Sequence, residues 1–457
     1  MKGIKTIVTA LFAWCAGLGW TQSDSSTLQF LFVGDVMQHG GQLAGAYVPA
    51  LDSYDYRDCF QFVKPLVQQA DIAIANLEVT HAGKPYKGYP QFSAPPELSE
   101  ALVDAGFNVI ITANNHSCDG GARGVVKTLD ALDKIGVKHT GTFRNKAERD
   151  AHYPLIIEEK GIKVAILNYT YGTNGLSVAP PLIINYIDSA TMKADFKKAK
   201  ALGAEWIICT LHWGTEYQSL PNACQKRWEQ FCYDHGADMV IGSHPHVIQP
   251  VVERTIKGEK KLTAYSLGNF VSNQRDRYKN GGLMLSAFVS ENEKGVQLDS
   301  ARHTFAYVHP RPEAHNKPYY ILPEFFYSKY RLDFMDGDAY HLYQEFFADS
   351  RQLFAEHATG TREYVVAEDT LIEQHYAALS GGYYSLEVPK EIVADKSLLM
   401  RSARTNVHKV LGADGQFHWL VGYYTTEEEA RRLVIYETEI SEPKPVFISP
   451  TTYKVLP

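Results

Sequence analysis

Val240-Ile241-Gly242-Ser243-His244-Pro245-His246 is the stretch of sequence that best indicates how this chain folds. The β-branched run at its start predicts a buried strand, which is followed by a glycine and two histidines one residue apart. Because a proline restricts the residue before it to extended conformations, we expect His244 to be extended and both imidazoles to point the same way. Two such rings at a strand end suit a metal ion, although a surface turn with two chance histidines would give the same pattern.

Four other apolar runs end abruptly in polar residues of the types that bind metals. These runs are Phe30–Asp35, Asp71–Glu78, Phe107–His116 and Trp206–Gly214. The polar residues at their ends are Asp35, Asn76, Glu78, Asn114, Asn115, His116 and His212. In α/β folds the loops that follow parallel strands converge at the carboxyl ends of those strands, so we expect five strands to deliver these side chains to one edge.

Composition places the chain among ordinary globular proteins. It has 457 residues and a formal net charge of −7, with 45% hydrophobic and 21% charged residues. The length predicts a large domain with at least one smaller unit. No basic stripe is present, so nucleic acid is not expected as a partner. An acidic polymer would meet a negatively charged protein, so metal ions or a local basic patch would have to offset the repulsion.

The N-terminus has the pattern of a secretory signal peptide over residues 1–22. Lys2 and Lys5 precede an uncharged apolar stretch, Thr6–Trp20, which is short for a membrane span. We therefore expect export to the periplasm or the cell surface. The alternative is an uncleaved N-terminus that anchors the protein in the membrane.

The cysteines do not form the pattern of a disulfide framework. Of six cysteines, Cys15 falls in the expected signal peptide, which leaves an odd number at irregular spacing. Cys224 and Cys232 lie too far apart along one predicted helix to pair with each other. Most of the cysteines are therefore expected to be buried free thiols.

The order of predicted elements indicates an α/β sandwich followed by smaller parts. Early alternation of strands and helices gives way to antiparallel strands, which suggests two sheets flanked by helices. The proline-rich stretch Pro310–Pro323 predicts a boundary. The expected units are a main domain at 28–310, a linker and helical segment at 311–397, and a small α+β unit at 398–457. In the last unit, Phe417–Tyr424 predicts a strand and Thr426 begins a helix.

Together the strand-end motifs resemble the bacterial capsule-synthesis family of CapA type, which is associated with poly-γ-glutamate. The motifs are Gly34-Asp35-Val36-Met37, Asn76-Leu77-Glu78, Asn114-Asn115-His116 with Asp119 and Gly121, His212-Trp213-Gly214 with Glu216-Tyr217, Gly242-Ser243-His244-Pro245-His246-Val247 with Gln249-Pro250, and Tyr265-Ser266-Leu267-Gly268-Asn269-Phe270. They occur in the family's order over about residues 28 to 290. The family resembles a branch of the calcineurin-like metallophosphatases, which implies a four-layer α/β/β/α sandwich.

The resemblance also implies roles for individual residues. The implied metal ligands are Asp35, Glu78, Asn115, His212, His244 and His246. Glu78 takes the place of a bridging carboxylate, and His116, beside the ligand Asn115, takes that of a general acid. These ligand types suit Mn, Zn or Fe, as one or two ions that would activate water and bind a phosphoryl or acyl oxygen.

One position departs from the metallophosphatase pattern. Those proteins have a histidine two residues after the first aspartate, and this chain has Met37. One metal site is therefore expected to be weak or missing. His39 is a candidate replacement, although it would equally fit a surface position.

Three functions are compatible with these features. The first is an exported metal-dependent hydrolase that cleaves a phosphoester or a γ-glutamyl-type bond in an envelope polymer such as capsule or polyglutamate. The second is a non-catalytic metal- or polymer-binding component of a membrane complex for capsule synthesis or export. The third is an envelope protein that binds peptidoglycan, because Leu420-Val421-Gly422-Tyr423-Tyr424 resembles part of the SPOR peptidoglycan-binding domain.

Overall fold

A computed structural model of the chain describes residues 27–310, 319–323 and 337–364, and five further strands between 383 and 455 by their backbone. The expected signal peptide and the helix expected from Thr426 lie outside the described residues. Among the described residues, no helix has both the length and the apolar character that crossing a membrane requires.

The first sheet has the order β18-β17-β16-β1-β4-β5-β6, with β15 paired to β1 and β19 paired to β17. Its strands are β1 (Leu28–Val36), β4 (Ile72–Leu77), β5 (Val109–Ile111), β6 (Lys138–Thr140), β15 (Asn269–Val271), β16 (Gly281–Asn292), β17 (Gly295–His309), β18 (Tyr320–Pro323) and β19 (Arg362–Glu363). Strands β1, β4, β5 and β6 are parallel, whereas β16 pairs antiparallel to β1. The carboxyl ends of β1, β4 and β5 therefore lie at one edge of this sheet.

The second sheet has the order β13-β14-β12-β11-β9-β8. Its strands are β8 (Leu155–Glu159), β9 (Ile162–Thr170), β11 (Trp206–His212), β12 (Met239–Ser243), β13 (Val251–Ile256) and β14 (Glu259–Ala264). The four inner strands are parallel and the two edge strands are antiparallel to their neighbours. The central strands β11 and β12 are buried along their length because both faces of the sheet are covered.

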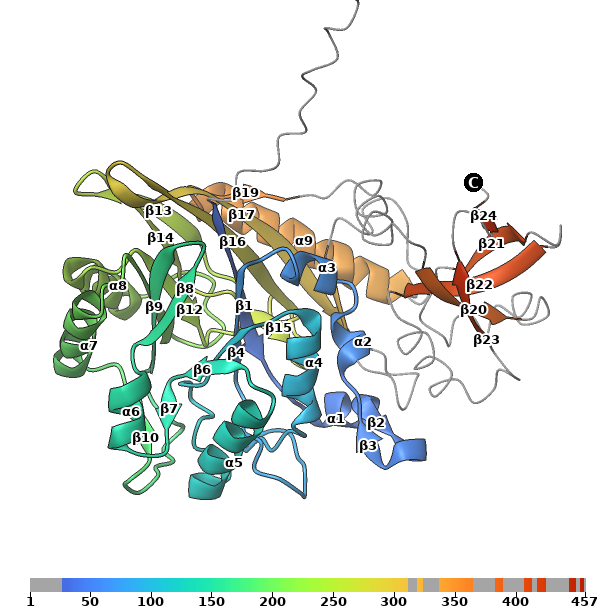
Figure 1. The fold of residues 1–457 in the computed structure, drawn as a ribbon, viewed down its shortest axis with the longest axis horizontal. Coiled ribbons are helices and arrows are strands. Elements are labelled where there is room, and N and C mark those ends of the chain that lie inside the picture. The colour runs from blue at the N-terminus through green and yellow to red at the C-terminus, as the bar shows by residue number, and fades with distance from the viewer. Residues whose placement is uncertain are drawn as a thin grey trace, which may run out of the picture.

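The two sheets pack face to face with helices on both outer sides (Figure 1). This packing follows from β1, whose alternate side chains point to opposite faces of the sheet. Phe30 and Phe32 join the core between the sheets, and Leu31 and Val33 join the core under the outer helices. Helices α2 (Arg57–Phe60), α3 (Lys64–Val67) and α4 (Glu97–Ala105) cover the first sheet, and α7 (Ser189–Ala201) and α8 (Ala223–His235) cover the second. The predicted four-layer α/β/β/α sandwich is confirmed.

Local sequence accounts for where several helices end. Helix α4 stops at Gly106, which adopts a φ of 114° that side chains other than glycine's rarely adopt. The helical pattern between Arg57 and Gln69 is broken near Pro65 into the short helices α2 and α3. The remaining short elements are α1 (Gly40–Ala46), β2 (Tyr47–Val48), η1 (Pro49–Leu51), β3 (Ser53–Tyr54), α5 (Gly121–Lys134), β7 (Thr142–Phe143), α6 (Lys146–His152) and β10 (Ile183–Ile184).

Part of the segment expected to be a linker belongs to the sandwich. Strand β18 pairs with β17, and helix α9 (Gly337–His357) buries Tyr343, Phe346 and Phe347 in the core between the sheets. The packed body therefore continues past the boundary expected near Pro310, because the proline-rich stretch leads into another strand of the same sheet.

The C-terminal part forms a separate five-stranded sheet, red in Figure 1. Its order is β23-β20-β22-β21-β24, from β20 (Tyr383–Val388), β21 (Val407–Gly412), β22 (Phe417–Tyr424), β23 (Lys444–Ile448) and β24 (Tyr453–Val455). The strand predicted at Phe417–Tyr424 is β22. Since β20 pairs with β22, this unit includes residues before 398, the start that we expected.

The described cysteines are all free, and all except Cys224 are buried. This agrees with the thiols expected from the sequence. The Sγ atoms of Cys209 and Cys232 lie 3.6 Å apart inside the core under α8, where both side chains act as small apolar groups.

Gly34 allows β15 to approach β1, and this contact makes a test of the fold. A Cβ atom at Gly34 would lie 1.9 Å from the carbonyl oxygen of Gly268, the same oxygen that accepts the amide of Asp35. We expect Gly34→Ala to lower the free energy of unfolding by about 1–3 kcal/mol. The measurement is chemical denaturation, with Gly40→Ala as control because a Cβ there meets nothing within 4 Å. Equal midpoints for the two variants would contradict this close approach.

Candidate metal centre

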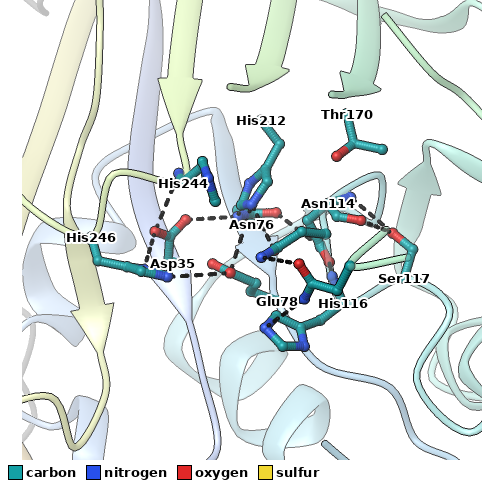
Figure 2. A network of polar contacts seen from close by, with 12 residues as sticks. Asp35, Asn76, Glu78, Asn114, His116, Ser117, Thr170, His212, His244 and His246 are labelled. Carbon is teal, nitrogen blue, oxygen red and sulfur yellow. Dashed lines mark hydrogen bonds and ion pairs between the residues drawn. The ribbon is translucent and has the colours of Figure 1, made fainter. Parts of the chain in front are cut away.

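Side chains from the ends of five strands meet between the two sheets (Figure 2). They follow β1, β4 and β5 in the first sheet and β11 and β12 in the second. The predicted residues that come together, all buried, are Asp35, Glu78, Asn115, His116, His212, His244 and His246. The convergence expected from the sequence is therefore present, but it joins the edges of two sheets instead of lying along one.

Five of these residues form two overlapping groups with the geometry to hold a metal ion. The first group is Asp35, Glu78 and His212, and the second is Glu78, His244 and His246. In each group the candidate ligand atoms all lie within 4.8 Å of one another. Glu78 is the residue common to both groups, which is the place that a bridging carboxylate would take.

The Glu78 carboxylate is buried without a hydrogen-bond donor on either oxygen. The Nε2 atoms of His212 and His246 lie 3.6 Å and 3.7 Å from Oε1 of Glu78, beyond hydrogen-bond distance. Burial, with the nearby charge of Asp35, raises the pKa of Glu78 well above its ordinary value. An unsatisfied buried carboxylate is costly, and a cation is the partner that its surroundings lack. The donor set therefore fits a divalent metal.

Two histidines of the groups are neutral, which is the form that binds metals. Burial, and the neighbouring histidines, lower the pKa of His212 well below its ordinary value. Burial likewise lowers the pKa of His244 to about 3, and the Nδ1 atom of this ring has no hydrogen-bond partner. Both ring nitrogens of His212 contact amide groups, Nε2 that of Asn115 and Nδ1 that of Asn76.

Two asparagines orient Asp35 of the first group and His246 of the second group. Asn76 donates from Nδ2 to Oδ1 of Asp35 at 2.8 Å. Nδ1 of His246 lies 3.0 Å from Oδ2 of Asp35 and 3.1 Å from Oδ1 of Asn269. Because both of these neighbours are acceptors, Nδ1 carries the proton and Nε2 is left free on the Glu78 side. Although burial raises the pKa of Asp35, its hydrogen bonds with His246 and Asn76 hold it below the ordinary value.

Sequence analysis assigned no individual role to Asn76 or Asn269, although both lie in the strand-end motifs. Asn76 lies near the end of β4, and Asn269 lies at the start of β15. The rule of polar residues after apolar runs placed Asn76 among the strand-end residues. What it could not show is that they contact ligands instead of serving as ligands.

Asn115 and His116 link the first group to a second polar cluster. Oδ1 of Asn115 lies 2.9 Å from Nε2 of His212, which places this amide oxygen beside the first group. Nδ2 of Asn115 donates to Oδ1 of Asn174, and Nδ2 of Asn174 lies 3.4 Å from Nε2 of His116. His116 is therefore adjacent to the centre without belonging to either metal group.

The other nitrogen of His116 is held by an aspartate. Nδ1 lies 2.8 Å from Oδ2 of Asp119, and the same oxygen accepts the amide of Phe92 at 2.6 Å. The Phe92 ring packs edge-on against His116 at 4.6 Å. The contact with Asp119 orients the ring, and Nε2 is left on the side of Asn174.

The extended backbone that we expected at His244 is wrong. His244 has a φ of 102° and His246 a φ of 58°, both in the region that favours glycine. The chain turns here because it must pass from the end of β12 to the β-bridge between Ile248 and Leu267. The turn is also held by a hydrogen bond of 2.8 Å from the amide of Tyr217 to the carbonyl of Pro245. Such conformations cost about 1–3 kcal/mol each and concentrate at functional sites.

Met37 and His39 do not join the centre in the described arrangement. Met37 is buried in the core beneath the helices that cover the first sheet. His39 caps helix α1, and its Nδ1 accepts the amide of Asn273 at 3.3 Å. The position where metallophosphatases have a histidine is thus apolar here, and His39 is in neither metal group.

Comparison with known proteins identifies the family. The model of the bacterial capsule synthesis protein PGA_cap family matches residues 29–274, more than half of the chain, so this chain belongs to that family. The capsule biosynthesis protein CapA of Bacillus anthracis is 28% identical over 270 residues, 55% of this chain and 61% of that protein. The PGA biosynthesis protein CapA of Bacillus subtilis is 30% identical over 273 residues, 56% of this chain and 65% of that protein. The matches thus span less than two thirds of either relative.

Solved structures with some likeness include two enzymes. The calcineurin-like phosphoesterase YfkN of Bacillus subtilis has a TM-score of 0.38 at 12% identity, over 72% of this chain and 98% of that chain. The NAD nucleotidase NadN of Haemophilus influenzae has a TM-score of 0.41 at 11% identity, over 92% and 89%. These TM-scores are too low to support a conclusion about this chain.

Proposed function

We propose that this chain is a divalent-metal-dependent hydrolase that acts on a capsule-type polymer of the bacterial envelope. The observation that carries the proposal is the buried Glu78 carboxylate, which lacks donors and is shared by two groups of potential ligands. If Glu78 served only in packing, a neutral or apolar side chain at this position would make the protein more stable. The family's link to capsule synthesis supplies the class of substrate.

The residues have distinct parts in this proposal. Asp35, Glu78 and His212, with Asn115, hold one ion, and Glu78, His244 and His246 hold a second where two are bound. Mn, Zn or Fe suit this mixture of oxygen and nitrogen ligands. When bound, the metal supplies a Lewis acid that lowers the pKa of water and stabilises charge on a phosphoryl or acyl oxygen.

His116 carries the proton chemistry in this proposal. Asp119 accepts from Nδ1, which fixes the orientation of the ring. Nε2 then holds the proton that the leaving group takes when a phosphoester or γ-glutamyl-type bond breaks. Asn76 and Asn269 act as positioning residues, because they hold Asp35 and the His246 ring in place.

Met37 favours a second candidate function. An apolar residue at this position removes one expected ligand, so the chain would bind metal or polymer without turning substrate over. In that case it would serve as a component of a membrane complex for capsule synthesis or export. The two functions differ in turnover and agree in metal binding.

Metal content and hydrolysis, measured on the full chain, test the proposal. We expect elemental analysis to find a divalent metal, added Mn or Zn to raise the thermal midpoint, and turnover of a phosphodiester, polyglutamate or an envelope glycan. His244→Ala should lose both metal and turnover, whereas His152→Ala, an exposed histidine on α6, should lose neither. Metal without turnover on any of these substrates would favour the non-catalytic function, and no metal at all would refute the hydrolase and the metal-binding form of the second function.

Export is a separate prediction that rests on Lys2, Lys5 and the apolar stretch to Trp20. Expressed in a bacterial host, the chain should be found in the periplasm or at the cell surface, because a charged start followed by an apolar segment directs secretion. Cell fractionation with N-terminal sequencing measures this, and Lys2→Glu with Lys5→Glu should retain more protein inside. A full-length chain with Met1, soluble in the cytoplasm, would contradict the prediction.

A further inference from the structure

Three exposed tyrosines lie near the candidate metal centre: two pack against its histidines, and the third packs against Phe92, which contacts His116. Tyr171, 48% exposed, has its ring centre 4.5 Å from that of His244. Tyr217, 46% exposed, lies 6.2 Å from the ring of His246. Tyr89, 73% exposed, lies 6.3 Å from Phe92, the ring that packs against His116. The three come from the loops after β9, β11 and β4, so they form a rim around the centre, which we call the tyrosine rim.

One side of this rim carries exposed cations that have no acidic partner. The loop 81–96, which includes Tyr89, contains Lys84 and Lys87 but no aspartate or glutamate. A Cβ atom at Gly83 would lie 2.8 Å from Nζ of Lys127 and 3.1 Å from Nη2 of Arg123, so two cations of helix α5 adjoin the same loop. These four exposed residues form no ion pair with any described residue, and we call Lys84, Lys87, Arg123 and Lys127 the cationic arm.

The cationic arm is held in a fixed place beside the centre. The amide of Phe92 donates to Asp119, the partner of His116. Lys87 pairs through its backbone with Ser93, and Gly88 packs so closely on His39 that a Cβ there would lie 3.0 Å from the His39 Cα. Because these contacts fix the loop beside His116, Lys84 and Lys87 are held in a defined position relative to the centre.

The part of the rim at Tyr217 is different in charge. Glu216 is exposed beside Tyr217. Lys279 lies over the Tyr217 ring at 4.3 Å, but it forms an ion pair with Asp276. Unpaired positive charge is therefore concentrated on the Tyr89 side, within a protein whose net charge is −7. A polyanion would be attracted to that side of the rim.

Resting on the proposed hydrolase function, we propose that the polymer is an acidic polysaccharide that lies across the tyrosine rim with its acidic groups on the cationic arm. The faces of aromatic rings carry negative charge and pack against the polarised C–H groups of a sugar face. Unpaired lysine and arginine side chains bind carboxylate or phosphate groups. A neutral glycan would leave the cationic arm unused, and a polyglutamate chain, which has no rings, would leave the tyrosine faces unused.

Binding tests this inference separately from turnover. The full chain with His116→Ala, which slows hydrolysis, is titrated calorimetrically with oligogalacturonate, poly-γ-glutamate and a neutral maltooligosaccharide. Oligogalacturonate should bind most tightly. Adding Tyr171→Ala should weaken its binding about tenfold, on the scale of one lost stacking contact, whereas Tyr171→Phe should not.

The contribution of the cationic arm is measured by how binding depends on salt. Lys84→Gln with Lys87→Gln should weaken oligogalacturonate binding about tenfold at low salt and less at high salt, because exposed charges are screened. The matched control is Lys193→Gln with Lys197→Gln on helix α7, which removes the same charge from an exposed surface away from the rim. This pair should leave binding unchanged.

The outcomes separate the inference from the proposed function. Oligogalacturonate binding that depends on both Tyr171 and the lysines, in a wild-type chain that hydrolyses nothing, would support the inference and refute the hydrolase. Poly-γ-glutamate binding that equals or exceeds that of oligogalacturonate would overturn the inference in favour of a peptide-like polymer. Absent binding of oligogalacturonate, or equal binding by all variants, would also overturn it.

Discussion

Replacing Glu78 by glutamine is expected to remove metal from both groups and to abolish hydrolysis. Glu78 is the residue that the two groups share, so loss of its charge weakens each of them, whereas any other substitution affects one. The same change should leave the metal-free protein as stable as the wild type, or more stable, because the buried carboxylate has no donors and lies near Asp35. Elemental analysis and thermal unfolding, each with and without added metal, measure these two effects.

The size of the stability effect depends on the metal concentration. A ligand present at a hundred times its dissociation constant stabilises a protein by about 2.7 kcal/mol, and Glu78→Gln should lose that increment. Glu229→Gln is the matched control, since Glu229 is also buried but pairs with Arg254 and accepts from Thr263. It should lower stability and keep the metal content. A Glu78→Gln protein that retains full metal content would show that the two groups are not the binding site.

Much of the fold could be predicted because the strands are regular. The apolar runs ending at Asp35, Glu78 and His212 are long enough to be strands, and an open α/β arrangement brings their carboxyl ends together whatever the loops do. The helix at Glu97–Ala105 could also be predicted from the sequence, because Gly106 can adopt the backbone conformation that ends it. These features depend on short-range pattern and on general rules of topology.

The details of the centre depend on contacts that the sequence does not contain. The backbone at His244 and His246 is set by a turn between two strands, and it overrides the extended preference before Pro245. The roles of Asn76 and Asn269 depend on which side chains the second sheet brings opposite the first. Likewise, proline-rich composition near Pro310 could not reveal that β18 and α9 return to the same core.

His116→Ala should lower turnover by about 10²–10⁴-fold while metal content stays at the wild-type level. The residue belongs to neither metal group, but Asn174 connects its Nε2 to Asn115 and hence to His212. Loss of its proton therefore affects the leaving group without loosening the ions. Steady-state kinetics on the best substrate of the wild type, together with elemental analysis, measure the two quantities on the same preparation.

Asp119→Asn separates the proton role of His116 from a role in loop structure. Asparagine still meets the amide of Phe92 through its side-chain oxygen, so the loop 81–96 keeps this contact, but the negative charge beside Nδ1 is lost. If His116 donates a proton, Asp119→Asn should lower turnover while metal content stays at the wild-type level, because the ring loses the carboxylate that orients it. If His116 only holds the loop, His116→Ala should keep wild-type turnover and Asp119→Asn should leave turnover unchanged, and the general-acid role would then be wrong.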